Sequence, residues 1–385
     1  MTELVDLTER LVAIPSHEDA TAAGDAVESW LRAETDARVE RDAVGNVLAY
    51  REPPGGSGRV GGDETLALVG HHDVVPPAEQ QTVGEGTDGE YVVEHRDGRL
   101  RGRGTADMKG SLAACLLAFR DATPPADRRL AFASFVGEEE GGTGARHAIS
   151  EGFTPDRAVV AEGSTGYSAP GVTDVAVAHK GRRASTLVAR GTAAHASEPE
   201  AGENAIYRAS DAIDVVRDLD APSATVFGES VTGSLAVTIV EGGETWNVIP
   251  ERCAVTIDER TVPGDRADLG RVEEAVTGVE WSVDQDLPPM ACEEAEFADA
   301  ALSVAREVHD AGGRESADHD PGAPEPEHVS KPHATDAGWL AEAGAACLVC
   351  GAAEPGEAHT DTESVGIDVL ERCRRIYRGI CEREA

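Results

Sequence analysis

Short apolar runs alternate with helical patterns along the N-terminal part of the chain. Four apolar runs in the whole sequence are followed by residues whose side chains can bind a metal ion. TLALVG leads into His71, LAFASFVG into Glu138 and Glu139, RAVVA into Glu162, and AACLVCG precedes His359. Continuous apolar runs of this length are typical of strands buried on both faces of a helix-covered sheet. Such sheets bind ligands beyond the carboxyl ends of their strands. The pattern therefore predicts an α/β domain in which these residues meet in one pocket.

The pattern changes over residues 173–286. It predicts a strand (DVAVAHKGRRASTLVAR), a helix (AIYRASDAIDVVRDL), two strands (SLAVTIVE and CAVTIDER), a second helix (RADLGRVEEAV) and a last strand (VEWSVDQ). This βαββαβ order is that of a self-sufficient split βαβ unit, so we interpret it as an inserted domain. The expected organisation is the first part of one domain at 1–172, the insert at 173–288, and the rest of the first domain at 289–385.

After the insert, the first domain is expected to resume with a helix around Phe297–Asp310 and to end with a helix around Ile367–Glu384. Between them, residues 312–333 are rich in Pro, Glu, Asp and Gly and lack apolar periodicity, which predicts a solvated loop. The histidines in this loop, His319, His328 and His333, are better explained as surface residues than as metal ligands.

Length and charge narrow the class of protein. A chain of 385 residues with 40% hydrophobic residues is expected to form two domains around real cores. The 72 acidic residues outnumber the 34 basic ones, and the net charge of −38 would repel nucleic acids and anionic membranes. Acidic residues spread along the chain and few lysines are typical of a surface hydrated in high salt, so we expect a saline cytoplasm. An ordinary acidic protein is the alternative.

The N-terminus and the cysteines agree with a soluble cytoplasmic protein. MTELVDLTERLVAIP is an amphipathic helix pattern with Leu4, Leu7 and Leu11 on one face, not an export signal. No apolar run approaches the ~18 residues of a membrane helix. Seven scattered cysteines do not form a disulfide framework. Cys347 and Cys350 form one CxxC inside an apolar run, which favours a buried strand over a redox or structural zinc site.

Two motifs contain candidate metal ligands, one at the end of a predicted strand and the other in a glycine-rich turn. In GHHDVVP, His71 and Asp73 project to the same side of an extended segment while His72 points away, and a carboxylate can orient a zinc-binding imidazole. Incidental polar surface is the alternative. In RGRGTADMKGSLAA, Asp107 stands just before a helix that begins near Lys109. It could also merely cap that helix, and the motif matches no nucleotide-binding pattern.

A third motif, FVGEEEGGTGA, places acidic residues directly after an apolar strand and before glycines that allow close packing around a site. Adjacent carboxylates repel one another unless a cation or solvent compensates. Metal-assisted hydrolysis needs one carboxylate as ligand and another free to take a proton, and Glu138 and Glu139 can divide these roles. Solvated surface is the alternative for so acidic a protein.

Taken together, five candidate ligands have the nitrogen and oxygen composition of a hydrolytic zinc pair: His71, Asp107, Glu139, Glu162 and His359. Each metal could take one histidine, one terminal carboxylate and a shared bridging aspartate.

Several motifs follow one another over nearly the whole chain in the order of a known family: GHHDVVP, RGRGTADMKG, GEEEGGTG, KGRRASTLVARGTAAHASEPEAGENAI, GGETWNVIPERCAVTIDER and AHTDTE. The chain resembles the di-zinc metallopeptidases that include acetylornithine deacetylase, succinyl-diaminopimelate desuccinylase, aminoacylase and glutamate carboxypeptidase. The resemblance implies a mixed, mostly parallel sheet flanked by helices, and a ferredoxin-like insert that acts as lid and dimer contact. It also implies two Zn²⁺ per subunit, with Co²⁺ or Mn²⁺ as substitutes.

The resemblance assigns roles to the candidate residues. It implies three ligands for each zinc: His71, Asp107 and Glu162 for one, and Asp107, Glu139 and His359 for the other. Glu138 would be the general base and Asp73 would orient His71. The Asp107–Met108 peptide is expected to be cis.

Three residues of the insert match substrate-binding positions of the family. His195 in AAHAS resembles the residue that polarises the scissile carbonyl, often from the partner subunit. Asn247 and Arg260 resemble the residues that bind the substrate carboxylate, a role that suits a planar guanidinium. For Arg260, a surface ion pair with a nearby acid is the alternative.

Two positions depart from the family pattern. Residues 351–353 are GAA where the family usually has GPG, and Gly137 stands where the first acid of a DEE triplet is common. We place Glu138 as base and Glu139 as ligand by their distance from the following glycines. A shift by one would make Glu139 the base and Glu140 the ligand.

The sequence therefore predicts a zinc-dependent amidohydrolase that removes the acyl group from an N-acyl amino acid and forms a homodimer. A di- or tripeptidase of the same family is the near alternative, because the catalytic residues are shared and the acyl pocket differs. A catalytically inactive binding protein with the same fold is the remote alternative, because all five ligands and the base are present.

Overall fold

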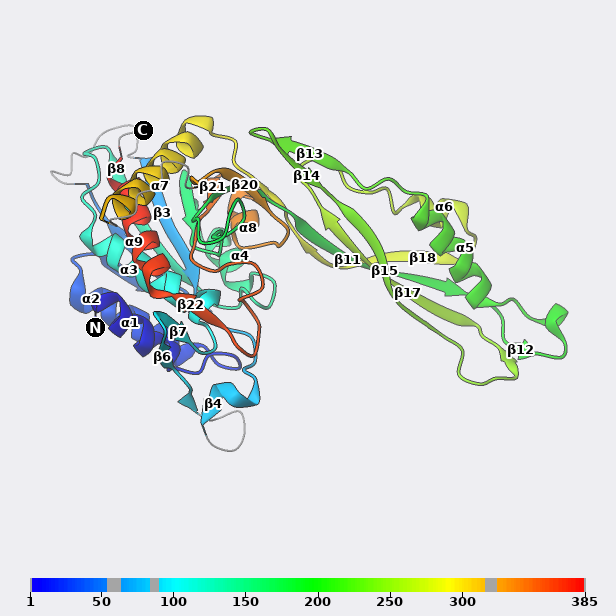
Figure 1. Ribbon diagram of the computed structural model, residues 1–385. Helices are drawn as coiled ribbons and strands as arrows, with labels where there is room; N and C mark the ends of the chain where they lie inside the picture. Colours follow the sequence, from blue (N-terminus) through cyan, green and yellow to red (C-terminus); the bar gives the residue numbers. More distant parts are fainter. Residues whose placement is uncertain (1, 54–63, 84–89, 316–323, 384–385) are drawn as a thin grey trace. The chain divides into compact units, whose positions relative to one another are not determined.

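Figure 1 shows a computed structural model of the chain. It describes residues 2–53, 64–83, 90–315 and 324–383. Contacts divide the chain into two compact units: unit 1 comprises Met1–Ala178, Ala291–Lys331 and Thr335–Ala385, and unit 2 comprises His179–Met290 and Pro332–Ala334. The insert predicted from the sequence spans residues 173–288. The second unit defined by contacts begins a few residues later, at His179. Within the described ranges, no helix is both long enough and apolar enough to cross a membrane.

A mixed sheet forms the centre of unit 1, in the order β1-β2-β8-β3-β9-β21-β10-β19, with β20 also paired to β10. Its strands are β1 (Arg38–Arg41), β2 (Val47–Arg51), β3 (Glu64–His71), β8 (Arg128–Phe135), β9 (Arg157–Val160), β10 (Val175–His179), β19 (Met290–Ala291), β20 (His328–Lys331) and β21 (Ala346–Val349). The four central neighbours β8, β3, β9 and β21 run parallel. These are the four apolar runs that the sequence analysis singled out, so their predicted arrangement in one α/β sheet is confirmed.

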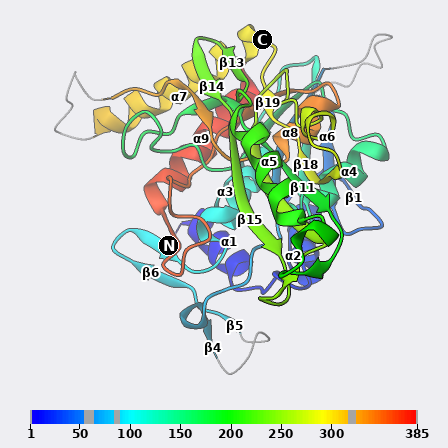
Figure 2. The same ribbon diagram turned by 90° about the vertical axis from the view of Figure 1, so that its right-hand side faces the viewer.

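The helices of unit 1 form two groups that contact this sheet, which Figures 1 and 2 show from two sides. They are α1 (Glu3–Val12), α2 (Thr21–Glu34), α3 (Gly110–Asp121), α4 (Thr143–Ser150), α7 (Ala295–Glu315), α8 (Ala337–Glu342) and α9 (Ile367–Glu382). Helix α3 contacts α1, α9 and the strands β3 and β8, whereas α8 contacts α4, β9 and β21. Leu4, Leu7 and Leu11 are buried, as their helical spacing predicts.

The smaller elements of unit 1 shape the loops at the ends of the central strands. They are η1 (Glu79–Gln81), β4 (Thr82–Val83), β5 (Glu90–Tyr91), β6 (Glu94–Arg96), β7 (Arg99–Arg101), η2 (Thr105–Lys109) and β22 (Ser364–Gly366). Strand β22 pairs antiparallel with β7, which brings two loops from opposite ends of the sequence together.

Unit 2 contains a four-stranded antiparallel sheet in the order β15-β17-β11-β18. Its elements are β11 (Gly181–Arg190), β12 (Ala194–His195), η3 (Pro199–Ala201), α5 (Ala205–Arg217), β13 (Ser223–Val226), β14 (Glu229–Thr232), β15 (Ser234–Gly242), β16 (Val248–Ile249), β17 (Arg252–Thr261), α6 (Arg271–Ala275) and β18 (Val279–Leu287). Buried Leu187, Val255 and Ile257 of the sheet form a core with Ala209 and Val216 of α5. The βαββαβ order is present, with a hairpin of β13 and β14 added to it.

The structure corrects two predicted elements. The single strand expected over residues 174–190 is two strands, because β10 is buried on both faces in the large sheet whereas β11 alternates buried and half-buried residues in the small one. The loop expected over residues 312–333 contains β20, whose one apolar residue, Val329, leaves too little periodicity to detect. Residues 316–323, including His319, lie outside the described part of the chain.

Candidate metal centre

Each predicted metal ligand lies at or beyond the carboxyl end of a central strand, or in the turn that faces these ends. His71 is the last residue of β3, Glu139 follows β8, and Glu162 follows β9. Asp107 lies in η2, where its peptide bond to Met108 is cis as the resemblance implies. His359 lies in the loop between β21 and β22. Parallel strands present these loops at one edge of the sheet, which is why residues distant in sequence meet here.

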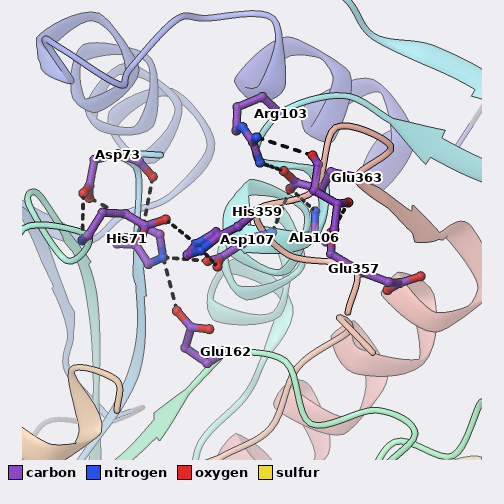
Figure 3. A network of polar contacts seen from close by, with 11 residues as sticks. His71, Asp73, Arg103, Ala106, Asp107, Glu162, Glu357, His359 and Glu363 are labelled. Atoms are coloured by element: carbon purple, nitrogen blue, oxygen red, sulfur yellow. Dashed lines mark hydrogen bonds and ion pairs between the residues drawn. The ribbon is translucent and has the colours of Figure 1, made fainter. Parts of the chain in front are cut away.

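The five predicted ligands form two lobes that share Asp107. Nε2 of His71 lies 3.1 Å from Oδ1 of Asp107 and 3.2 Å from Oε1 of Glu162. Nε2 of His359 lies 3.0 Å from Oδ2 of Asp107 and 3.0 Å from Oε1 of Glu139. The two oxygens of Asp107 are thus divided between the two histidines, as Figure 3 shows.

The donor atoms of this centre fit two divalent metal ions. Ligand atoms of His71, Glu138 and Glu162 all lie within 4.8 Å of one another, and so do those of His71, Asp107 and Glu139; these two groups share His71 and overlap the two lobes without coinciding with them. Two imidazoles and several carboxylates, without a cysteine, are the ligand set of hydrolytic metal pairs. Each histidine Nε2 faces oxygens of two carboxylates. A divalent cation bound between them would compensate the negative charge of these carboxylates.

The titrating groups show how strongly charge is concentrated here. Although burial opposes it, hydrogen bonds to His359 and His71 lower the pKa of Asp107 below its usual range. Hydrogen bonds to Asp107 and Glu139 raise the pKa of His359 to about 10. Burial raises the pKa of Glu138 well above its ordinary value, and the nearby carboxylates of Glu162 and Glu139 add to that shift while His71 opposes it.

Asp73 contacts the turn of Glu138 and Glu139 as well as His71. Its backbone carbonyl lies 3.0 Å from Nδ1 of His71, and its carboxylate Oδ1 lies 3.5 Å from the same atom. The carboxylate also accepts hydrogen bonds from the backbone N–H groups of Glu138, at 3.4 Å, and Glu139, at 3.2 Å. One aspartate therefore supports both a ligand histidine and the turn with the adjacent glutamates. His72 points away and lies with Nδ1 2.8 Å from Oγ of Ser134.

The turn after β8 bears on which glutamate is the base. Gly137 has φ +68°, and a Cβ at this position would lie 2.1 Å from Oγ1 of Thr143, so any larger residue here would be strained and would require Thr143 to shift. Glu140 is exposed and belongs to neither ligand group found among the described residues, whereas Glu138 and Glu139 each belong to one. This geometry favours the unshifted assignment.

Two buried ionisable residues near the centre were not identified from the sequence. Asp336, 3% exposed, precedes α8, and burial together with Asp73 and Glu162 raises its pKa to about 7, against the effect of His71. Lys331, 5% exposed, ends β20; burial lowers its pKa, which the carboxylates of Glu162 and Asp107 oppose. An aspartate directly before the apolar run AGWL was the one available signal, and it is equally typical of a helix cap.

The three predicted substrate residues lie in unit 2. His195 in β12 is exposed, and its Nδ1 lies 2.6 Å from Oγ of Ser197. Asn247 is beside it, because its backbone carbonyl accepts a hydrogen bond of 2.9 Å from the N–H of Ala196. Arg260 in β17 donates from Nε to Oδ1 of Asp258 at 2.8 Å, the kind of ion pair that the alternative interpretation expected. The roles of these residues towards substrate stay predictions.

The α/β fold and the candidate ligand groups are those of a metallohydrolase. Residues 67–383 match the sequence profile of peptidase family M20/M25/M40, and the chain belongs to this family. It is 30% identical over 354 residues to acetylornithine deacetylase of Myxococcus xanthus, a match that covers 89% of this chain and 83% of the relative.

Solved structures of the family share the fold. The aminopeptidase PepT of Bacillus cereus has a TM-score of 0.74 at 18% identity, covering 98% of this chain and 96% of that one. The YXEP protein of Bacillus subtilis, described as a dinuclear metal-binding peptidase of the M20 family, has a TM-score of 0.67 at 12% identity, covering 98% and 96%. Family membership identifies this chain as a metal-dependent hydrolase of amide bonds.

Proposed function

We propose that the chain is a two-zinc amidohydrolase that removes the acyl group from an N-acyl amino acid. The observation that carries the proposal is the division of the Asp107 carboxylate between His71 and His359, with the half-buried Glu138 close to His71 and Glu162. The similarity to an acetylornithine deacetylase supports the acylated amino acid as substrate. A tripeptidase of Staphylococcus aureus has a similar fold, with a TM-score of 0.68 at 18% identity. A di- or tripeptidase activity is therefore the competing proposal.

The proposed ligands form two sets, one for each metal ion. His71, Asp107 and Glu162 would hold one, and Asp107, Glu139 and His359 the other, with Co²⁺ or Mn²⁺ able to replace Zn²⁺. When bound, the pair supplies Lewis acidity to the amide carbonyl and lowers the pKa of a water molecule.

The chain itself moves the proton. The carboxylate of Glu138 takes a proton from the attacking water while the water oxygen forms a bond to the carbonyl carbon. When the C–N bond breaks, Glu138 gives that proton to the leaving nitrogen, so a carboxylic acid and an amine are released and Glu138 returns to its starting state. Asp73 holds the turn of Glu138 through the backbone N–H groups, and His195 would donate a hydrogen bond to the developing oxyanion.

The direct test is a hydrolysis panel of N-acetylornithine, N-succinyl-diaminopimelate, other N-acyl amino acids, dipeptides and tripeptides, with added zinc. Release of the acyl group from an N-acyl amino acid is the expected result. Cleavage of peptides alone would replace this proposal with the peptidase one. Absence of turnover with the whole panel by folded, metal-loaded protein would favour the inactive binding protein.

We further propose a saline cytoplasm as the environment of the enzyme. The net charge of −38 supports the high salt, and the seven cysteines, all buried and free, support a reducing compartment. Running the panel at low and at molar KCl tests the first part, because full activity and stability at low salt would contradict it. A disulfide found by mass spectrometry in protein isolated from its source would contradict the second.

Arg260 is proposed to bind the substrate carboxylate, and Arg260→Lys should raise KM about 10- to 100-fold, because a lysine cannot replace the two-pronged guanidinium contact. The matched control is Arg182→Lys, since Nε of Arg182 donates to the other oxygen of the same Asp258, at 2.6 Å. Steady-state kinetics on the preferred substrate measure both variants. Equal effects of the two changes would indicate that Arg260 acts only through its ion pair.

A homodimer formed through the free edge of β15 is also proposed. This edge strand exposes Ile239 (51%) and Val240 (52%), whereas the opposite edge, β18, carries acidic residues that discourage strand pairing. Light scattering should give twice the mass of one chain, and Val240→Lys should shift the protein towards monomer. Val283→Lys, on the exposed face of β18, is the control and should leave the dimer intact. A parent protein of single-chain mass would rule the dimer out.

A further inference from the structure

A buried ion pair lies directly behind the bridging aspartate. The side chain of Glu363 is fully buried and that of Arg103 is 3% exposed. Oε2 of Glu363 pairs with a guanidinium nitrogen of Arg103. Oε1 accepts hydrogen bonds from the backbone N–H groups of Ala106, at 2.9 Å, and Asp107, at 3.1 Å. One carboxylate thus holds the backbone of the residue whose side chain faces both histidines, as Figure 3 shows.

The same ion pair joins the two segments that carry Asp107 and His359. Glu363 follows His359 by four residues, and its backbone carbonyl accepts a hydrogen bond of 3.1 Å from the N–H of Gly102. Arg103 donates to the backbone carbonyl of Thr360 at 3.4 Å. Arg103 and Glu363 therefore connect the segment that carries His359 to the segment that carries Asp107.

The two lobes of the centre are supported differently. His71 is the last residue of a central strand and is 1% exposed, so the sheet itself fixes it. His359 lies in a loop, has φ +62° and a side chain that is 51% exposed, and therefore depends on local contacts for its position. Loss of the ion pair should disturb the lobe of His359 more than the lobe of His71.

We propose that Glu363 and Arg103 are positioning residues that set the spacing between Asp107 and His359, and so determine the affinity for the ion held by Asp107, Glu139 and His359. The inference rests on the proposed ligand set. The competing explanation is that the pair stabilises the fold without selectivity for either lobe, because unpairing a buried charge weakens a protein wherever it occurs.

Glu363→Gln separates these explanations. It keeps the length of the side chain and an oxygen for the N–H groups of Ala106 and Asp107, but places an uncharged amide against Arg103. The matched control is Glu259→Gln in unit 2. Glu259 is equally buried, pairs with Nε of Arg183 at 2.5 Å and accepts a hydrogen bond of 2.9 Å from the N–H of Ala267.

The experiment is a calorimetric titration of metal-depleted full-length protein with Zn²⁺, repeated with Co²⁺ while its visible absorption is recorded. The parent and Glu259→Gln should bind two ions per chain. Glu363→Gln should bind the first ion with parental affinity and the second about 10- to 100-fold more weakly, the usual effect of losing a residue that orients a ligand. Circular dichroism checks that each variant is folded, and Glu363→Asp is titrated in place of a Gln variant that is not.

Equal affinities in Glu363→Gln and the parent, or equal weakening of both ions, would overturn the positioning role. A similar selective loss in Glu259→Gln would overturn it as well. A parent chain that binds no second ion would overturn the proposed metal centre itself, a result distinct from failure of the positioning role alone.

Discussion

Glu138→Gln is expected to lower kcat about 10²- to 10⁴-fold, the range by which a positioned general base accelerates proton transfer. The change keeps the shape of the side chain and removes its capacity to take and return a proton. KM and the binding of two ions should change little, because the separate ligands of the two lobes stay in place. Steady-state kinetics together with metal analysis of the same sample measure kcat, KM and the bound metal.

The matched control for this prediction is Glu140→Gln in the same acidic run. Glu140 is exposed, whereas Glu138 is half-buried and lies near the carboxylates of Glu162 and Glu139. The control should keep parental kcat. Should Glu140→Gln lose bound metal and Glu139→Gln lose only turnover, the assignment would be shifted by one residue and Glu138 would not be the base.

Asp107→Asn is expected to weaken the binding of both ions and to lower kcat/KM by at least about 10³-fold, because several kcal/mol of transition-state stabilisation depend on the metal pair. The reason is geometric: Oδ1 of Asp107 faces His71 and Oδ2 faces His359. An asparagine offers one oxygen in place of two and no charge.

Glu162→Gln is the comparison, because Glu162 contacts His71 and belongs to one proposed lobe. It should weaken one ion and leave the other close to its parental affinity. Equilibrium dialysis with metal analysis would distinguish the two variants. An Asp107→Asn protein that keeps two ions at parental affinity would show that the aspartate does not bridge them.

The parallel part of the central sheet is predicted well from the sequence, because each of its strands can be identified from neighbouring residues alone. Each of the four parallel strands is a continuous apolar run, and the residue types after the strands already indicate a metal site. The alternation of buried residues in β11 is equally local, but the boundary between β10 and β11 is not visible, because only Lys180 separates the two strands. Strand β20 has one apolar residue and no signal of its own.

What the sequence does not show are the contacts that support the ligands. Asp73 was expected to orient His71, but its hydrogen bonds to the N–H groups of Glu138 and Glu139 depend on how the loops after two neighbouring strands approach each other. Arg103 and Glu363 are 260 residues apart, and neither has a pattern that points to the other. Such pairs become visible once the sheet has placed both loops at one edge.

Whether this chain is a two-metal amide hydrolase is tested most directly by titrating metal-depleted protein with Zn²⁺ while the hydrolysis of an N-acyl amino acid is recorded. The expected result is no turnover before metal is added, a rise that follows the added zinc and is complete at two ions per chain, and reversal by a chelator. Full turnover in metal-depleted protein, or bound zinc in excess of two with no turnover of any N-acyl amino acid or peptide, would contradict it.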